Sequence, residues 1–275
     1  MSAKSKIEWT DATWNPVTGC TKISEGCRNC YAERIANRFW DHPFTEVQLR
    51  ASFLDKVFDQ PYHWKKPRRI FVCSMGDLFH EDVPTSFIGD VVDVMGSTSQ
   101  HTYMILTKRP QRMMELWNIN SAPGGRLGKN GLKNVWLGVS VENQKAADER
   151  IPLLLQTPAP VRFVSVEPML EEINLTKPFC KTCENGQRGF GSLSGFSPCP
   201  ECDDNPGLHS LDWVICGAES GPGARPFEME WARDLKNQCV QAGVPFFFKQ
   251  ARIDGRLVKM PELDGQIWDQ YPEVK

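Results

Sequence analysis

The fold prediction depends on the stretch VWLGVSVENQKAADERIPLLLQTPAPVRFVSVEP, residues 135–168. Its two ends, 135–140 and 161–166, are apolar runs rich in valine, and each is too short for a helix. The segment between them, 144–157, is long enough for one. Two strands joined by a helix form the unit from which parallel sheets with right-handed crossovers are built.

Similar short apolar runs recur along the chain, with segments long enough for a helix between most of them. The further runs are 70–74, 103–107, 212–217 and 245–250, and 13–19 is the expected first strand. We therefore predict an α/β fold of about seven βα units, a partial or complete (β/α) TIM-like barrel with parallel strands. Because the strand order cannot be read from the sequence, an open doubly wound sheet remains the alternative.

The barrel domain is predicted to cover residues 1–252, with two insertions. Residues 121–131 are rich in glycine and cationic residues, and residues 176–210 carry four cysteines and form a metal-binding insertion. Beyond about Arg252 the periodicity fades, so residues 253–275 are expected to form a loosely packed C-terminal extension.

The composition leaves the function open but directs attention to the cysteines. The chain has 275 residues, with 32 Lys and Arg against 34 Asp and Glu, so its net charge gives no general attraction to nucleic acid or to membranes. It shows neither a signal peptide nor a transmembrane segment, and we expect a cytoplasmic protein. In a reducing compartment, ten cysteines point to metal binding or catalysis more than to disulfides.

Polar residues follow several of the predicted strands. Glu142, Glu167 and Glu219 each come just after an apolar run, and Ser74 ends another. The carboxyl ends of parallel strands meet on one face, so these side chains are expected to form a site there. The alternative is that they cap the helices that follow.

Three cysteines lie close together in NPVTGCTKISEGCRNCYAERIANRF, residues 15–39. Cys20, Cys27 and Cys30 have the spacing C-x6-C-x2-C and precede a helix that begins near Tyr31. Three thiolates can hold three irons of a [4Fe-4S] cluster and leave the fourth iron open for another ligand. The alternatives are a zinc or structural iron site completed by a residue such as Cys73, or buried thiols.

Seven motifs in order give the chain a family resemblance. They are IEWTDATWNPVTGC, SMGDLFHEDVP, LTKRPQRM, GVSVENQ, VSVEPML, GAESGPGARP and FFFKQ. In these motifs the chain resembles the phage- and prophage-associated three-cysteine-motif proteins, which are similar to the radical S-adenosylmethionine superfamily, in particular its spore-photoproduct-lyase-like members. Most of that superfamily has C-x3-C-x2-C with an aromatic residue before the third cysteine. Here Asn29 takes that position and Tyr31 follows the cysteine.

The resemblance implies an enzyme of the lyase or transferase kind. Its cofactors would be a [4Fe-4S] cluster on the three cysteines and S-adenosylmethionine, from which a 5′-deoxyadenosyl radical is generated. Ser74, Glu142, Glu167, Glu219 and Tyr31 are the candidates for binding S-adenosylmethionine or substrate, and Lys249 is a further one. No catalytic residue is assigned. The implied partners are a one-electron donor such as a flavodoxin or ferredoxin, a nucleic acid base or nucleotide as substrate, and a protein from the same phage locus.

A second group of cysteines fits a separate metal site. Cys180, Cys183, Cys199 and Cys202 form two C-x2-C pairs fifteen residues apart, a spacing typical of structural zinc. The alternatives for this group are a second iron-sulfur cluster and no bound metal.

A different class of function also fits the sequence. Lys65, Lys66, Arg68 and Arg69 lie beside two aromatic residues, which is typical both of nucleic-acid contacts and of an ordinary solvated face. The competing hypothesis is a metal-stapled phage protein that binds nucleic acid or another protein without catalysis. A barrel hydrolase that uses the strand-end carboxylates is a third.

Overall fold

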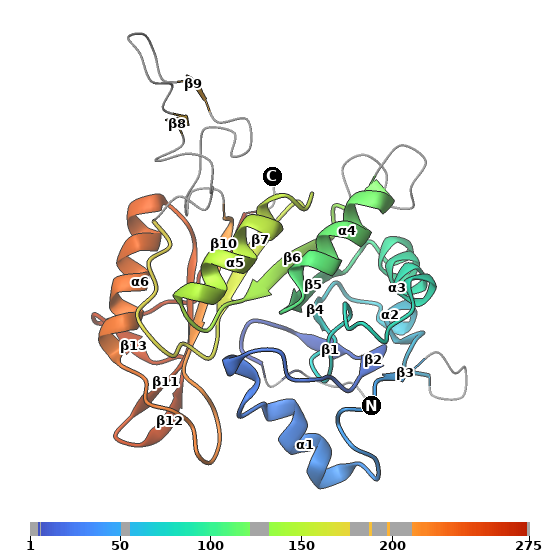
Figure 1. Ribbon diagram of the computed structural model, residues 1–275, viewed down its shortest axis with the longest axis horizontal. Helices are drawn as coiled ribbons and strands as arrows, with labels where there is room; N and C mark the ends of the chain where they lie inside the picture. The colour runs from blue at the N-terminus through green and yellow to red at the C-terminus, as the bar shows by residue number, and fades with distance from the viewer. Residues whose placement is uncertain are drawn as a thin grey trace.

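The computed structural model describes residues 5, 7–50, 56–121, 132–176, 187–188, 197–198 and 211–273. Within them, one eight-stranded sheet has the order β1-β4-β5-β6-β7-β10-β11-β12 (Figure 1). Its strands are β1 (Ala12–Trp14), β4 (Arg69–Val72), β5 (Thr102–Thr107), β6 (Val135–Ser140), β7 (Arg162–Val166), β10 (Trp213–Gly217), β11 (Phe246–Ile253) and β12 (Arg256–Lys259).

The order of the strands distinguishes the two predicted topologies. The first seven strands of the sheet follow chain order and pair in parallel, and β12 is antiparallel to β11. An open doubly wound sheet would reverse its order part-way, and this sheet does not. Among the described residues β1 and β12 do not pair with each other, so the sheet is a curled half-barrel. The prediction of a partial (β/α) barrel is confirmed.

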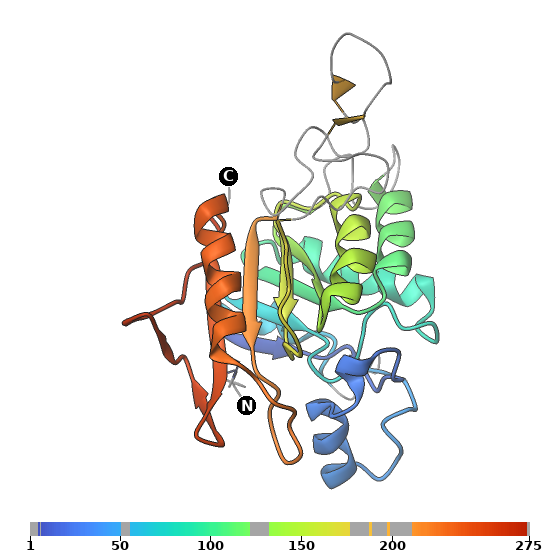
Figure 2. The same cartoon turned by 60° about the vertical axis from the view of Figure 1, so that its left-hand side comes forward.

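Helices cover the convex face of the sheet (Figure 2). The long ones are α3 (Thr85–Ser97), α4 (Pro110–Ser121), α5 (Gln144–Leu155) and α6 (Met229–Ala242). Gly243 ends α6 in the left-handed conformation, with φ of 69°, as a C-cap glycine does. Alternate strand residues pack against these helices in the main hydrophobic core, because side chains along a strand point to opposite faces.

The concave face has its own, largely aromatic core. Its buried members are Trp9, Phe71, Met104, Trp136, Val161, Phe163, Trp213, Ile215 and Phe247. A Cβ at Gly138 would lie 2.5 Å from the ring of Phe163, so the glycine in β6 leaves the space that this ring fills. The strands supply most of these rings, so this layer fills the inside of the half-barrel and leaves the strands' carboxyl ends above it.

The segment that bears the three cysteines lies at one end of the half-barrel. It follows β2 (Val17–Thr18), contains the short 3-10 helix η1 (Glu25–Cys27) and leads into α1 (Tyr31–Phe39). The remaining elements are β3 (Gln48–Leu49), α2 (Gln60–His63), β8 (Gln187–Arg188), β9 (Ser197–Pro198), β13 (Glu262–Leu263) and β14 (Gln266–Ile267). No helix in the described part of the chain is long and apolar enough to cross a membrane.

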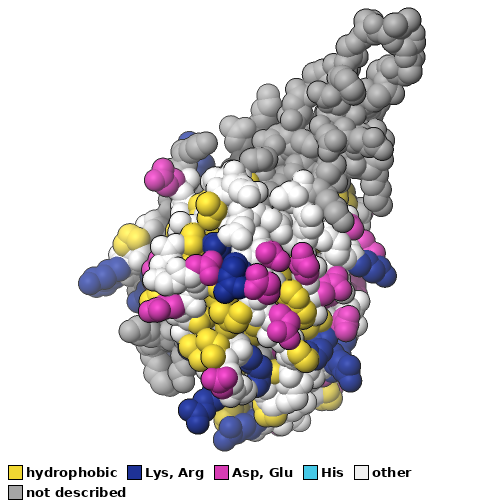
Figure 3. All heavy atoms as spheres, turned by 90° about the vertical axis from the view of Figure 1, so that its left-hand side faces the viewer, with side chains coloured by type: hydrophobic (Ala, Val, Ile, Leu, Met, Phe, Trp, Pro, Cys, Tyr) yellow, Lys and Arg dark blue, Asp and Glu magenta, His cyan; other side chains and the backbone are white. Residues whose placement is uncertain are grey.

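The C-terminal residues are better packed than expected. Strand β11 runs across the predicted boundary at residue 252, and β12 extends the sheet from it. Leu263 and Trp268 are buried in the main core, and the Trp268 carbonyl accepts a hydrogen bond from the Phe248 N–H. The expectation of a loosely packed extension is therefore not met. Hydrophobic side chains also reach the surface on this side of the molecule (Figure 3).

Candidate functional site

A cavity of about 940 Å³ lies at the carboxyl ends of the strands. Side chains that follow β4, β5, β7 and β10 line it, which agrees with the expected position of a site in this class of fold. Cys20, Cys27 and Cys30 all lie on its wall. The cavity is of the size that binds small molecules and cofactors.

The backbone holds the start of the cysteine loop against two other segments. The Gly19 N–H donates to the Met75 carbonyl at 2.9 Å, and the Cys20 N–H donates to the Phe44 carbonyl at 2.9 Å. Gly19 has φ of 88°, and a Cβ there would lie 2.2 Å from the Glu46 carbonyl oxygen. Only glycine fits this turn, and the turn carries Cys20 into the cavity wall.

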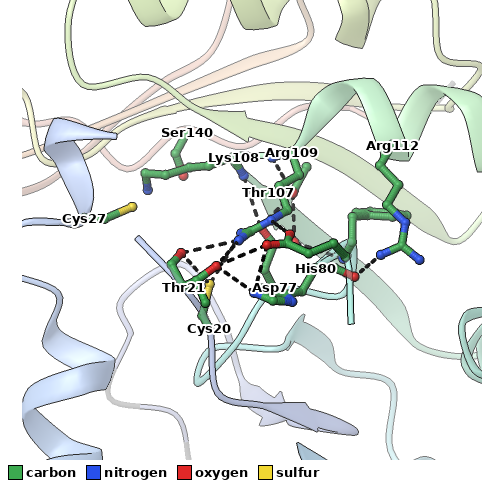
Figure 4. A network of polar contacts seen from close by, with 12 residues as sticks. Cys20, Thr21, Cys27, Asp77, His80, Thr107, Lys108, Arg109, Arg112 and Ser140 are labelled. Carbon is green, nitrogen blue, oxygen red and sulfur yellow. Dashed lines mark hydrogen bonds and ion pairs between the residues drawn. The ribbon is translucent and has the colours of Figure 1, made fainter. Parts of the chain in front are cut away.

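Arg109, which follows β5, holds the first cysteine from the other side (Figure 4). Its guanidinium donates to Cys20 Sγ at 3.4 Å, to Asp77 Oδ2 at 3.3 Å and to Thr21 Oγ1 at 2.9 Å. Asp77 is buried and also accepts from the Thr107 hydroxyl at 2.8 Å. Burial and the nearby Asp77 carboxylate raise the pKa of Cys20 to about 11, although Arg109 acts against them.

His80 supports this network and does not face the cavity. Its Nδ1 accepts a hydrogen bond from the Asp82 N–H at 3.1 Å, so Nε2 carries the proton and donates to Thr21 Oγ1 at 2.8 Å. Burial, with Arg109 nearby, lowers the pKa of His80, and the ring is neutral near pH 7. The neutral His80 imidazole thus fixes the side chain of Thr21, the neighbour of Cys20.

Lys108 serves the second cysteine. Its side chain extends toward Cys27 at the cavity wall (Figure 4). Burial opposes ionisation of Cys27, but Lys108 and backbone donors outweigh it and lower the pKa of the thiol. A cation at this position favours a thiolate.

Glu142 is not part of the cavity wall. It is 1% exposed and forms an ion pair with Arg150 of α5, with Oε2 2.9 Å from Nη1. Its Oε1 accepts from the Gly26 N–H at 3.4 Å, and the Ser24 side chain also hydrogen-bonds to this carboxylate, so Glu142 contacts the cysteine loop. Although burial acts against it, Arg150 lowers the pKa of Glu142. The geometry gives this predicted cofactor ligand a supporting position behind the loop.

Glu219 lines the cavity but is also held by an arginine. Arg225 Nη2 lies 2.5 Å from its Oε1, and the Asn29 amide donates to its Oε2 at 2.8 Å. Arg225 also donates to the Glu25 carbonyl at 3.1 Å. Burial acts in the opposite direction, but these donors lower the pKa of Glu219. Asn29 therefore ties the cysteine loop to the end of β10.

Glu167 is the strand-end carboxylate that faces the cavity with a lysine. Its Oε1 lies 2.5 Å from Lys249 Nζ and accepts from the Gln250 amide at 3.2 Å. Both Glu167 and Lys249 line the cavity and are partly exposed. Ser74 and Tyr31 also line it: the Tyr31 hydroxyl donates to the Ser74 carbonyl, and the Ser74 hydroxyl donates to Asn15 Oδ1.

Comparison with known proteins places the chain in a family. Residues 4–272 match the family described as Protein of unknown function (DUF5131). The chain belongs to this family. No curated protein matches it.

Solved structures of spore photoproduct lyase share features of this fold at low identity. One single mutant of that lyase is 11% identical, with a TM-score of 0.48 over 90% of this chain and 78% of the other. A double mutant with bound AdoMet and dinucleoside spore photoproduct is also 11% identical, with a TM-score of 0.45 over 82% of this chain. The chain spans 60% of the length of that second protein.

The cavity wall offers the thiol donors that an iron-sulfur cluster takes. Among the described residues, no group of three or more His, Cys, Asp or Glu side chains is arranged around one point as for a single metal ion. In a [4Fe-4S] cluster held by three cysteines each thiolate binds a different iron, so the three ligands do not converge on one point. The cations at Cys20 and Cys27, and the N-terminus of α1 after Cys30, suit an anionic group.

The four cysteines of the predicted zinc site lie outside the described residues. Lys108 and Arg109 follow an apolar run, so the sequence placed them at a strand end, but it did not show their contacts with the cysteines. Arg150 and Arg225 gave no signal, because an ion pair with a residue six or eight positions away depends on side-chain geometry.

Proposed function

We propose that the chain is a radical S-adenosylmethionine enzyme in which Cys20, Cys27 and Cys30 hold a [4Fe-4S] cluster. The observation that carries the proposal is the position of these three cysteines on the wall of a single cavity, next to Lys108 and Arg109. Bound together, the cluster and S-adenosylmethionine supply reductive cleavage chemistry that yields a 5′-deoxyadenosyl radical.

The residues of the chain have three tasks in this proposal. Lys108 and Arg109 compensate the charge of the thiolates, which lowers the cost of placing an anionic group in a partly buried site. Glu219 fixes the loop through Asn29, and Glu142 fixes it through Gly26. Such supporting contacts orient the residues that hold a metal group.

Glu167 and Lys249 would orient the organic cofactor or the substrate. The Glu167 carboxylate can accept from an amino or hydroxyl group, and Lys249 offers donors to an anionic one. Tyr31 and Ser74 complete this part of the wall. The aromatic layer on the concave face closes the cavity from below and keeps bulk water away from that end.

The proposal extends to partners and to a second metal. A nucleic acid base or nucleotide is the proposed substrate, and a flavodoxin- or ferredoxin-like donor would supply the electron. A partner protein from a shared phage locus and zinc on Cys180, Cys183, Cys199 and Cys202 complete the proposal.

Metal analysis after anaerobic reconstitution tests the cluster. The wild-type chain should bind about four iron and four sulfide, beside any zinc. Cys27→Ala should lose most of both, whereas Cys239→Ala should keep them, because Cys239 lies on the buried face of α6 and does not line the cavity. Equal iron and sulfide in the two variants would contradict the assignment and favour a protein without this chemistry. Release of 5′-deoxyadenosine under reducing conditions tests the reaction itself.

A further inference from the structure

The charges on the cavity wall do not balance. Four carboxylates line it, and each is in an ion pair. The pairs are Glu8–Lys259, Asp77–Arg109, Glu167–Lys249 and Glu219–Arg225. Three further cations line the cavity without an ion pair to a carboxylate in the described part of the chain: Arg34, Arg38 and Lys108. Lys108 acts on Cys27, which leaves Arg34 and Arg38. The wall therefore has an excess of positive charge, which attracts anions.

Two of these cations lie on α1, beside an exposed apolar stripe. Tyr31, Ile35 and Phe39 are four residues apart, so they share one face of the helix, and they are 40%, 43% and 71% exposed. All three line the cavity together with Arg34 and Arg38. Figure 3 shows hydrophobic and basic side chains together at the lower end of the molecule, the end at which α1 and β12 lie in Figure 1.

Arg34 is held in place by packing. Its Nη1 is buried and has no hydrogen-bond partner among the residues that the structure describes. The guanidinium lies directly on Gly221, where a Cβ would be 1.7 Å from Nη1 and where φ is 94°. A side chain at position 221 would displace the guanidinium. The backbone at Gly221 thus fixes the orientation of the Arg34 guanidinium. Its charge has no counter-ion in the described part of the chain, so an anionic ligand would supply the missing partner.

The positive charge of Arg38 lies beside the exposed ring of Phe39. Its guanidinium carbon lies 5.2 Å from the centre of the exposed Phe39 ring. Planar guanidinium groups match the geometry of phosphate oxygens, and exposed rings stack on nucleobases. A ligand that carries both phosphates and flat apolar rings suits this combination better than a carboxylate or a lipid chain does.

We propose that the exposed face of α1 docks a single-stranded nucleic acid at the mouth of the cavity. Arg34 and Arg38 contact backbone phosphates, Phe39 and Tyr31 stack on bases, and the strand presents one nucleotide toward the cysteines. This names the substrate class of the proposed function and rests on it for the chemistry, but the docking itself needs no turnover.

Fluorescence anisotropy on the reconstituted protein tests the docking. The probe is a labelled oligodeoxythymidine of about 15 nucleotides, enough to fill a typical single-strand site. Arg34→Gln/Arg38→Gln should weaken binding on the order of tenfold and should reduce the slope of log K against log salt by about 1.4, the value for two phosphate contacts. The charge-matched control Lys133→Gln/Lys145→Gln changes two exposed lysines outside the cavity wall and should bind as the wild type does.

A second variant separates stacking from charge. Phe39→Leu keeps an apolar side chain at an exposed position, so the fold is not at risk, and it should weaken binding by about fivefold or more without changing the salt slope. Wild-type affinity and slope in the double arginine variant would overturn the proposal. Equal affinity for free thymidine monophosphate would overturn the docking of a strand.

Cluster content measured on the same samples keeps the two proposals apart. Oligonucleotide binding that depends on Arg34 and Arg38 in protein without a cluster would contradict the proposed chemistry and keep the docking surface. A complete cluster in protein that does not bind the oligonucleotide would contradict the docking surface alone.

Discussion

Glu142 and Glu167 follow neighbouring strands at matching positions, since Ser140 of β6 pairs with Ser165 of β7. Glu142 is almost fully buried on Arg150 and supports the cysteine loop from behind. Glu167 faces the cavity and shares its carboxylate with Lys249. The two carboxylates differ because their partner cations differ. Arg150 of α5 pairs with Glu142 in the core, and Lys249 of β11 pairs with Glu167 at the cavity wall.

Removing the charge of Glu142 should therefore mainly lower stability, and removing that of Glu167 should mainly weaken ligand binding. Glu142→Gln leaves the buried Arg150 without its anion and should lower the free energy of unfolding by about 3 kcal/mol. Glu167→Gln breaks a more exposed pair and should cost within about 1 kcal/mol. Urea unfolding of the two variants makes the comparison. Equal losses would show that the two strand ends do not differ in this way.

The effect of Glu142→Gln on stability should depend on pH. Arg150 holds the pKa of Glu142 below its ordinary value of 4.5, so the carboxylate stabilises the folded state above that value. This contribution is lost as the pH falls through the lowered pKa of the folded state. The difference between wild type and Glu142→Gln should be largest near neutral pH and should shrink in acid. Urea unfolding over a pH series measures it, and a constant difference would contradict the ion pair as its source.

Glu167→Gln should affect the ligand instead. Loss of the carboxylate removes an acceptor from the cavity wall and leaves Lys249 without its partner, so S-adenosylmethionine should bind about tenfold more weakly. Anaerobic calorimetry measures the change. Glu149→Gln, on the exposed side of α5, is the matched control and should bind normally. Unchanged binding in Glu167→Gln would remove this residue from the cofactor site.

Lys108→Gln is expected to have the smallest effect. A nearby positive charge stabilises the reduced, more negative cluster, so its removal should lower the reduction potential by on the order of 50 mV. Lys145→Gln changes an exposed lysine that does not line the cavity and should leave the potential unchanged. A redox titration followed by EPR compares the two variants, and equal potentials would place Lys108 too far from the cluster to act on it.

The alternation of strands and helices, and the meeting of polar side chains at the strand ends, could be predicted because both follow from local pattern. Gly243 ends α6 as a glycine at that position should. The order of the strands in the sheet could not be predicted, since it depends on packing between segments that are distant in the sequence. Strand β12 escaped notice because all four of its residues are exposed, so it has no alternation of buried and exposed positions.

The sequence predicted which residues belong to the candidate site, but it did not predict the role of each one. The three cysteines, Glu167 and Glu219 line one cavity, whereas Glu142 lies behind it. Nothing in the sequence distinguished Glu142 from Glu167, because the motifs GVSVEN and FVSVEP are nearly alike. Their roles are decided by Arg150 and Lys249, whose positions depend on the tertiary fold.

EPR of the anaerobically reconstituted, dithionite-reduced protein, recorded with and without S-adenosylmethionine, tests most directly whether the three cysteines leave an open iron at the cavity. The account predicts a [4Fe-4S]⁺ signal that changes when S-adenosylmethionine is added and that is absent from Cys27→Ala. A signal indifferent to S-adenosylmethionine, or one that persists in Cys27→Ala, would contradict it.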